Sequence, residues 1–466
     1  MPPIDVASVA VPGPIRVVRV DVDAPLPDLS PFRDGGPPYS SAWLLVLRSG
    51  RPIGEMQIEF DGRVLPAADL GDRLRAGFGI EPTGSTGHAA TSGHAATSGH
   101  AATLADQAAA AAELPTISVV VPSTFERLAM LERCVDALLA QDYPAFEVIV
   151  VDNRPDESVG RAALHSWLAR DVRVRVVTEA RRGISAARNR GIAVATGSVI
   201  ACTDDDVEME RDWLRAIGRR FAAEPATDCV AGPVLPRELE TPAQIWFERG
   251  GSKIGQRYEP VRFVNDGSWR TRPLGALRGG RFEVTAHSGG SPGSSVSIYS
   301  GKFGMGANIA FRADALRALG GFDEALGAGS PSGGGEDLLA ISRLMFAGRQ
   351  VAFDPDAYVY HTHRDTLNDL ERQVYAYGTG YTAMLCALFM TDPRHLIGFA
   401  SYAGRALRLA RHRSADREAD AYPRQLSRAE ARGLLRGPLL YVSGRRRARR
   451  GIGVRSGQPD VVESAG

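Results

Sequence analysis

The sequence predicts an α/β protein whose main domain is built on a mostly parallel sheet covered by helices on both faces. Short, wholly apolar segments such as ISVVVP (117–122) and FEVIVVD (146–152) have the length of buried strands. Stretches with helical spacing of apolar residues lie between them, as in LAMLERCVDALLA (128–140). Polar residues follow the strands directly, at the sheet edge where ligands bind in such folds.

Further strands are expected at VRVRVV (172–177), SVIACT (198–203) and CVAGPV (229–234), with a helix over Ile184–Val194 feeding into the second of these. Right-handed crossovers then place the carboxyl ends of the strands along one edge of the sheet. Residues 240–300 are rich in Gly, Ser and Arg and have no assignable periodicity.

The chain divides into four parts by composition. Residues 1–82 alternate apolar strand-like segments with Gly and Pro breaks, which indicates a small β-rich accessory domain. Residues 83–114 contain a six-residue repeat that places His88, His94 and His100 in phase. A metal-binding tract is one interpretation, but the Gly, Ser, Thr and Ala around the histidines favour a flexible linker. Residues 115–390 form the α/β domain, and residues 391–466 form a basic helical extension with a polar tail.

Bulk composition excludes several classes of protein. Of 466 residues, 55 are basic and 54 acidic, so the net charge of +1 gives no reason to expect nucleic acid as a partner. The four cysteines form no CxxC pair, which fits a reducing cytoplasm better than a disulfide framework. No apolar stretch reaches the ~18–20 residues of a spanning helix, and the first residues do not resemble a secretory signal. A cytoplasmic enzyme is expected.

Three carboxylates, Asp204, Asp205 and Asp206, follow the strand SVIACT directly. Alternation along an extended backbone lets Asp204 and Asp206 project to the same side. Such carboxylates suit Mg²⁺ or Mn²⁺, especially when phosphate oxygens complete the coordination shell. A solvated acidic turn is the alternative, although unpaired carboxylates at a buried strand end are costly. Arg188 is expected on the same rim, where it can bridge the metal site and a diphosphate; an ordinary surface arginine is the alternative.

Two more motifs contain side chains suited to catalysis or metal binding. Glu336 and Asp337 follow a glycine-rich loop and open an amphipathic helix, either as acids favoured by the helix dipole or as a general base on a mobile loop. His361 and His363 in YVYHTHRD lie on one side of an extended strand, where a neutral imidazole is a suitable third ligand for Mn²⁺. A structural pair of histidines is the alternative.

Together these segments resemble the family 2 glycosyltransferases, which have a Rossmann-like GT-A fold. The resemblance covers residues 116–390. It rests on four blocks in the order and spacing of the family: ISVVVPSTFERLAMLERCVDALLAQDYPAFEVIVVDN, GISAARNRGIAVATGSVIACTDDDVEM, GMGANIAFRADALRALGGFDEALGAG and GGGEDLLAISRLMFAGRQVAFDPDAYVYHTHR. The first block departs from the family in having Glu126 where an Asn usually precedes the arginine, which leaves the role of Arg127 open.

The resemblance implies a role for each candidate residue. The roles are nucleoside contacts for Pro122 and Thr124, a hydrogen bond to the base for Asp152, and a place beside the diphosphate for Arg188. Asp204 and Asp205 are implied to bind the donor. Asp204 and Asp206 are implied to bind the metal, together with His363 or His361. Catalysis is implied for Asp337 with Glu336, and a place on the acceptor side for Asn308.

The expected activity is an inverting, metal-dependent transfer of a hexose-like sugar from a nucleoside-diphosphate sugar to an acceptor hydroxyl. UDP, GDP and dTDP are not distinguished, nor is a glycan, lipid-linked or small-molecule acceptor. Two alternatives remain open: a sugar nucleotidyltransferase, and a non-catalytic carbohydrate-binding or scaffolding protein. The apolar and Arg-rich segment LLRGPLLYVSGRRRARRGIGVR (434–455) is expected either to lie on an anionic membrane or to pack on the catalytic domain ahead of a basic tail.

Overall fold

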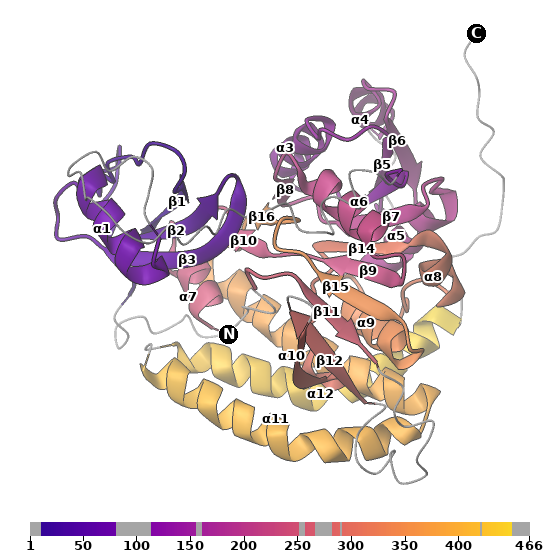
Figure 1. Ribbon diagram of the computed structural model, residues 1–466. Coiled ribbons are helices and arrows are strands. Elements are labelled where there is room, and N and C mark those ends of the chain that lie inside the picture. The colour runs from indigo at the N-terminus through magenta and orange to yellow at the C-terminus, as the bar shows by residue number, and fades with distance from the viewer. Residues whose placement is uncertain are drawn as a thin grey trace.

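A computed structural model gives the architecture of the chain (Figure 1). It describes residues 11–80, 113–154, 161–250, 257–265, 282–288, 291–419 and 422–449. The repeat with His88, His94 and His100 and the polar tail after residue 449 lie outside these residues.

The N-terminal unit is a small three-stranded sheet with one helix. Strand β1 (Ile15–Asp21) pairs parallel with β2 (Ser41–Arg48), and β2 forms an antiparallel hairpin with β3 (Arg51–Glu59). Helix α1 (Ala67–Phe78) covers one face through Leu70 and Leu74, which are buried among the strand side chains.

A ten-stranded mixed sheet forms the centre of the molecule, in the order β13-β12-β11-β15-β9-β14-β7-β4-β5-β6. One half is parallel: β4 (Ile117–Ser123), β5 (Phe146–Asp152), β6 (Val174–Thr178) and β7 (Val199–Thr203). The helices between these strands are α3 (Leu128–Leu139), α4 (Arg161–Leu168) and α5 (Ile184–Val194), and the last has the bounds expected from the sequence.

The other half contains strands of both directions. Strand β14 (Asn308–Arg312) runs antiparallel to both β7 and β9 (Thr227–Ala231), so β9 and its parallel neighbour β15 (Gln350–Phe353) keep the direction of the parallel half. An antiparallel ladder completes the sheet with β11 (Val261–Val264), β12 (Glu283–Ser288) and β13 (Ser291–Ser297). The remaining helices of this region are α6 (Trp213–Ala223), α7 (Pro242–Arg249), α8 (Ala313–Ala318), α9 (Glu336–Phe346) and the 3₁₀ turn η3 (Ile298–Ser300).

A separate three-stranded sheet lies beside the carboxyl end of β7. Strand β16 (Val359–His361) pairs with β10 (Val234–Pro236) on one side and β8 (Val207–Met209) on the other. The segment CVAGPV, expected as one strand, is therefore divided between β9 and β10. The break falls at Gly232, where a Cβ atom would lie 1.8 Å from the carbonyl oxygen of Ala357, and at Pro233, which has no N–H to donate to a ladder.

Three long helices, α10 (Leu367–Thr391), α11 (Arg394–Ala419) and α12 (Arg424–Arg449), run along the lower side of the molecule in Figure 1. Helices α10 and α12 come into close backbone contact at glycine residues. A Cβ atom at Gly433 of α12 would lie 2.3 Å from the carbonyl oxygen of Tyr375, and one at Gly378 of α10 would lie 2.4 Å from that of Glu430. Within the described residues, no helix combines the length and apolar content needed to cross a bilayer.

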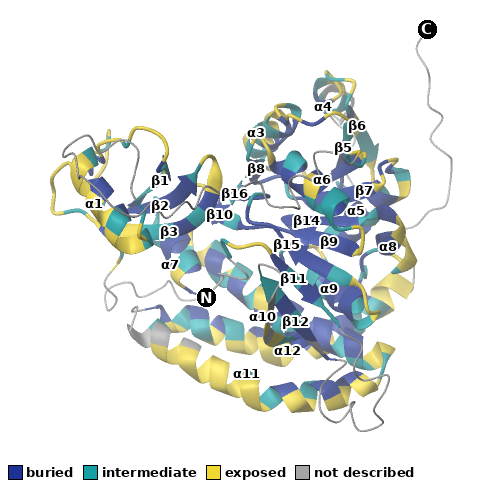
Figure 2. Ribbon diagram, viewed as in Figure 1, coloured by how far each residue is buried: buried dark blue, intermediate teal, exposed yellow. Residues whose placement is uncertain are grey.

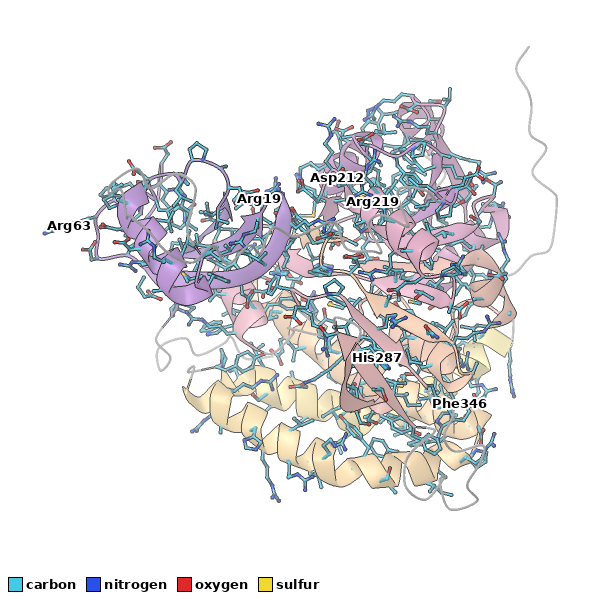
Figure 3. All side chains as sticks on the ribbon, viewed as in Figure 1. Arg19, Arg63, Asp212, Arg219, His287 and Phe346 are labelled. Carbon is cyan, nitrogen blue, oxygen red and sulfur yellow. The ribbon has the colours of Figure 1, made fainter. Side chains whose placement is uncertain are left out.

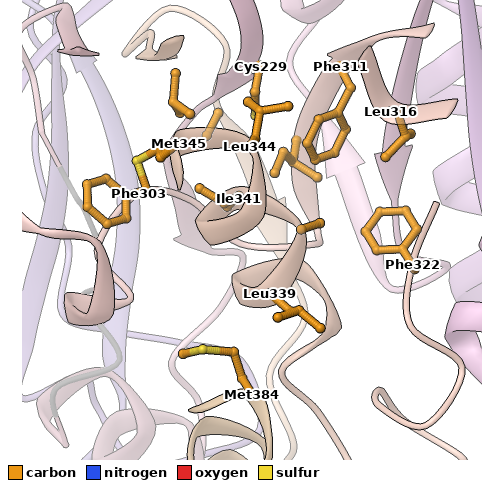
Figure 4. Packing of buried hydrophobic residues seen from close by; sticks show 14 of the residues in the cluster. Cys229, Phe303, Phe311, Leu316, Phe322, Leu339, Ile341, Leu344, Met345 and Met384 are labelled. Atoms are coloured by element: carbon orange, nitrogen blue, oxygen red, sulfur yellow. The ribbon is translucent and has the colours of Figure 1, made fainter. Parts of the chain in front are cut away.

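Helix α9 forms the centre of the largest hydrophobic core. Its buried side chains Leu339, Ile341 and Leu344 pack with Phe303, Phe311 and other residues of the sheet and of α10 (Figure 4). Because the first turn of α9 carries Glu336 and Asp337, this packing fixes the position of both carboxylates.

The N-terminal unit packs on the catalytic region through the face of its sheet opposite α1. Trp43 and Leu45 are buried there against Leu235 of β10 and against Tyr358, the residue before β16. At the boundary between the two parts, Arg19 forms an ion pair of 2.7 Å with Glu210 (Figure 3).

The expected fold class is confirmed: an α/β molecule with a large central sheet, an N-terminal β-rich unit and a C-terminal helical region. The sheet has antiparallel strands that the sequence did not reveal, and three of them, β11, β12 and β13, lie in residues 240–300.

Candidate active site

The acidic segment lies where β7 ends and β8 begins, between the central sheet and the small sheet. Asp205 and Asp206 are both buried. Asp205 accepts a hydrogen bond of 2.6 Å from Ser123 Oγ, and Arg127 donates to Asp205 Oδ1 at 3.1 Å and to Asp206 Oδ2 at 2.7 Å. The first strand of the domain and the loop after it therefore compensate two of the three carboxylates.

Arg188 joins the acidic segment to the start of α9. Its guanidinium is almost fully buried and lies 2.8 Å from Asp204 Oδ1 and 2.8 Å from Glu336 Oε1. It also donates to the carbonyl oxygen of Gly306 at 3.0 Å. The structure therefore brings Arg188 and Asp204 together on one rim and adds Glu336 to them.

Asp337 lies beside this cluster and is half-exposed, whereas Glu336 is buried. The backbone N–H of Gly306 donates to Asp337 Oδ2 at 2.7 Å, and that of Leu338 donates to Oδ1 at 2.7 Å. Gly335, which precedes the helix, has φ of 90°, and a Cβ atom there would lie 2.3 Å from the carbonyl oxygen of Gly380. Only glycine fits this position, so the backbone turn aims Asp337 with its carboxylate held by two N–H groups.

His361 and His363 form a chain that runs from the acidic segment into the protein. His361 Nε2 lies 3.4 Å from Asp206 Oδ1, and the two Nδ1 atoms of the histidines are 2.8 Å apart. His363 Nε2 lies 2.6 Å from Glu248 Oε1 of α7. His361 faces the acidic segment, and His363 is the more deeply buried of the two.

The electrostatics of the site follow from burial and these pairs. Burial and neighbouring Asp337 raise the pKa of Glu336 to about 7, against the opposing charge of Arg188. Burial raises the pKa of Asp205 to about 6, although the hydrogen bond from Ser123 and the charge of Arg127 oppose it. Burial would also raise the pKa of Asp206, but His361 and Arg127 outweigh it and hold that pKa below its ordinary value.

The donor set near β7 fits a hard divalent cation, judged by its chemistry and spacing. In an octahedral Mg²⁺ or Mn²⁺ site with ligands at about 2.1 Å, neighbouring ligand atoms lie about 3 Å apart. The 3.4 Å between Asp206 Oδ1 and His361 Nε2 is close to that spacing. Among the described residues no three His, Cys, Asp or Glu side chains already stand in a ligating arrangement, because Asp204 is turned toward Arg188. Mg²⁺ sites commonly use one or two protein carboxylates, with phosphate oxygens and water as the other ligands.

The residues expected to contact the nucleoside lie at the carboxyl ends of β4 and β5. Pro122 is buried in β4, and Thr124 is exposed just after it. The carboxylate of Asp152 is fully buried, where it accepts hydrogen bonds from Arg154 at 2.9 Å and lies 3.0 Å from His165 Nε2. Arg154 is therefore bonded to the carboxylate that is expected to accept or share a hydrogen bond with the nucleoside base.

Asn308 lies in β14, outside this cluster of charged residues. Its amide nitrogen donates to the carbonyl oxygens of Pro233 and Ala357, and its amide oxygen accepts from Trp213 Nε1 at 2.8 Å. These bonds use both N–H groups of the buried amide and join β14 to the segments flanking the small sheet. In this structure Asn308 therefore organises the backbone next to the small sheet.

Sequence reasoning missed two members of the site. The departure at Glu126 left the role of Arg127 open, and in the structure Arg127 forms ion pairs with both Asp205 and Asp206. Glu248 lies in a stretch with no assigned structure. The only local signal was the capping box of Thr241 and Gln244, which marks the start of α7.

Part of this chain is similar to known glycosyltransferases. Residues 118–284 match the model of the family described as glycosyl transferase family 2. The pre-mycofactocin glycosyltransferase of Mycobacterium tuberculosis is 30% identical over 188 residues, which are 40% of this chain and 32% of that protein. The glucosyl-dolichyl phosphate glucuronosyltransferase of Haloferax volcanii is 32% identical over 121 residues, 26% of this chain and 38% of that protein. The chain thus spans about a third of the length of these relatives.

Solved structures give weaker similarities. A mannosyltransferase from Pyrobaculum calidifontis, in complex with GDP-mannose and Mn²⁺, aligns with 69% of this chain and 88% of its own, with a TM-score of 0.42 and 18% identity. GalNAc-T7, solved with UDP, GalNAc and Mn²⁺, aligns with 58% of this chain and 50% of its own, with a TM-score of 0.39 and 17% identity. The sequence match begins in β4 and includes the acidic end of β7, and over residues 118–284 this chain is similar to glycosyl transferase family 2.

Proposed function

We propose that this protein transfers a sugar from a nucleoside-diphosphate sugar to an acceptor hydroxyl, with inversion at the anomeric carbon and with Mn²⁺ or Mg²⁺ as cofactor. One observation carries the proposal: Arg188 bonds at once to Asp204 of the acidic segment and to Glu336, the neighbour of Asp337. The buried guanidinium of Arg188 therefore links Asp204, proposed for the donor side, to the Glu336-Asp337 pair, proposed for the acceptor side. Neither a nucleotidyltransferase nor a binding protein requires that arrangement.

Asp337 is the proposed general base. It is the half-exposed member of the Glu336-Asp337 pair, and two backbone N–H groups orient its carboxylate. A base held in this way is already aimed when the acceptor arrives, so little reorganisation is needed before it accepts the hydroxyl proton. Glu336 is bonded to Arg188 and keeps that guanidinium in place.

On the donor side, Asp204, Asp206 and His361 would hold the divalent cation, whose charge stabilises the departing diphosphate when bound. Arg188 lies next to Asp204 and supplies a second positive charge near the leaving group. Arg127 neutralises Asp205 and Asp206, which limits the repulsion within the acidic segment before the cation and donor bind. Ser123 fixes Asp205 through its hydroxyl, so Asp205 acts in donor binding by shaping the segment.

Product analysis tests this function against its two alternatives. Purified protein with Mn²⁺ is supplied with UDP-, GDP- and dTDP-sugars and with glycan, lipid-linked and small-molecule acceptors. We expect release of free nucleoside diphosphate with one donor, and a product of inverted anomeric configuration by NMR. Release of pyrophosphate from a sugar phosphate and nucleoside triphosphate would instead establish a nucleotidyltransferase, and binding without turnover would establish a non-catalytic protein.

We also propose that α12 lies on the surface of an anionic membrane. Leu435 and Leu439 lie one turn apart on the outer face of this helix, with 81% and 74% of their surface exposed. Figure 2 shows α11 and α12 as the helices with long exposed stretches. The arginines exposed around the apolar pair are Arg428, Arg432, Arg436, Arg446 and Arg447. Apolar side chains within a ring of arginines are typical of helices that rest in the headgroup region.

Vesicle co-sedimentation of the full chain tests the membrane surface. We expect binding to vesicles that contain anionic lipid, weaker binding at high salt, and loss of most binding in the double variant Leu435→Ser, Leu439→Ser. Val172→Ser removes an equally exposed apolar side chain far from α12 in sequence and should bind as the unchanged protein does. Protein that stays in the supernatant at low salt would contradict the proposal.

A further inference from the structure

Glu248 ends the histidine chain that begins at the acidic segment. It belongs to the last turn of α7, a helix fixed at its start by the capping box of Thr241 and Gln244. Its carboxylate is largely buried and lies 2.6 Å from His363 Nε2. Phe247, the preceding residue, packs on the ring of His363 with ring centroids 4.4 Å apart. Helix α7 therefore holds His363 by both a carboxylate and an aromatic ring.

We propose that Glu248 is a positioning residue that sets the tautomer of His361 so that its Nε2 presents a lone pair to the cation site. This inference rests on the proposed function, because it concerns the cation held by Asp206 and His361. It also selects His361 over His363 as the histidine ligand, a choice that the sequence left open.

The assignment follows from counting protons along the chain of contacts. A cation can bind His361 only at an Nε2 atom that carries no proton, so the proton of His361 must sit on Nδ1. That Nδ1–H then donates to His363 Nδ1, 2.8 Å away, which must carry no proton. The proton of His363 is therefore on Nε2, where it needs an acceptor, and the Glu248 carboxylate at 2.6 Å provides it. With a cation at His361 Nε2, this arrangement gives every nitrogen of the two histidines a partner, and it requires an acceptor at Glu248.

An amide at this position permits the opposite arrangement. In Glu248→Gln the side-chain NH₂ group can donate to His363 Nε2, which moves the proton of His363 to Nδ1. His363 then donates to His361 Nδ1, and the proton of His361 is left on Nε2, facing Asp206. In that state His361 cannot bind a cation through Nε2, although both histidine side chains are unchanged.

Mn²⁺ binding by the full chain tests the inference without turnover. Free Mn²⁺ is measured by electron paramagnetic resonance in titrations with the metal alone, with UDP and with GDP. Loss of an outer hydrogen-bond partner of a metal ligand typically lowers affinity 10–100-fold, and we expect a rise of about that size in the Mn²⁺ dissociation constant of Glu248→Gln. Spin-echo spectra should contain the ¹⁴N modulation of a bound imidazole in the unchanged protein and lose most of it in the variant.

A double-mutant cycle separates positioning from a structural role. His361→Ala should weaken Mn²⁺ binding at least as much as Glu248→Gln, and the double variant should be no weaker than His361→Ala alone, because Glu248 acts through His361. Asp354→Asn is the matched control. It removes a buried carboxylate from its ion pair with Arg220, outside this chain of contacts, and should leave the Mn²⁺ affinity unchanged.

Two results overturn the inference, and each has a distinct meaning. If Glu248→Gln binds Mn²⁺ as tightly as the unchanged protein and keeps the ¹⁴N modulation, Glu248 does not set the tautomer, and the cation site of the proposed function still stands. If the unchanged protein binds no Mn²⁺ with either nucleotide, the cation site itself is wrong and the role of Glu248 falls with it. Melting temperatures of all variants exclude unfolding as the cause.

Discussion

Replacing Asp337 by asparagine should lower kcat by ~10²–10⁴ while the affinity for the donor changes little. The variant keeps the size of the side chain and can keep one of its two hydrogen bonds to the backbone N–H groups of Gly306 and Leu338. What it loses is the ability to accept a proton. Steady-state rates of nucleoside-diphosphate release give kcat, and donor affinity is measured separately by calorimetry.

The control for this variant is Asp369→Asn. Asp369 is also a carboxylate in the first turn of a helix, α10, where it bonds Thr366, so its replacement removes the same interaction with a helix dipole away from the site. We expect both variants to lose a similar, small amount of stability and only Asp337→Asn to lose turnover. A normal kcat in Asp337→Asn would leave Asp337 with the role of a helix N-terminal acid.

Removal of the divalent cation should abolish turnover, and Mn²⁺ or Mg²⁺ should restore it after chelation with EDTA. The corresponding variant, Asp206→Ala, should weaken metal-dependent donor binding as well as the rate. Asp206 Oδ1 lies 3.4 Å from His361 Nε2. The loss of Asp206 leaves Arg127 with its ion pair to Asp205 at 3.1 Å. Donor binding measured with and without Mn²⁺ gives the metal-dependent part directly.

Asp212→Ala serves as the comparison, because Asp212 is an exposed carboxylate next to α6 and close in sequence to the acidic segment (Figure 3). It should respond to EDTA and Mn²⁺ as the unchanged protein does. Full activity in EDTA would contradict the assignment of Asp204 and Asp206 as metal ligands, and would require Arg188 and Arg127 to stabilise the leaving group by themselves.

The parts of the fold with strong local signals were predictable from the sequence. FEVIVVD coincides with β5, and the helix expected over Ile184–Val194 coincides with α5. Asn153 follows β5 and Gly183 precedes α5. Buried strands and helices with such clear ends need no distant partner to be recognised. The acidic segment follows β7, Arg188 lies within α5 and the Glu336-Asp337 pair opens α9. Their places in the fold were predictable in the same way, while their roles stay predictions.

The remaining elements depend on contacts between distant segments. Strand β13, SPGSSVS, contains Pro and Gly and has few apolar residues, so it is a strand only because it pairs with β12. The strands β8, β10 and β16 have three residues each and gain their structure from one another. The pairing of Arg127 with Asp206 joins residues 79 positions apart, and that of His363 with Glu248 joins residues 115 positions apart. Neither leaves a local pattern in the sequence.

The shared bonds of Arg188 determine how damage to the two sides of the site will combine. A variant at Asp204 leaves the Arg188 guanidinium paired with Glu336, and a variant at Glu336 leaves it paired with Asp204. In either single variant the buried charge of Arg188 is still neutralised. Loss of both carboxylates removes these two ion pairs at once from a side chain that is almost fully buried. The decreases in the free energy of unfolding of the two single variants should therefore sum to less than the decrease in the double variant. In energetic terms the acidic segment and the start of α9 would then behave as a single unit.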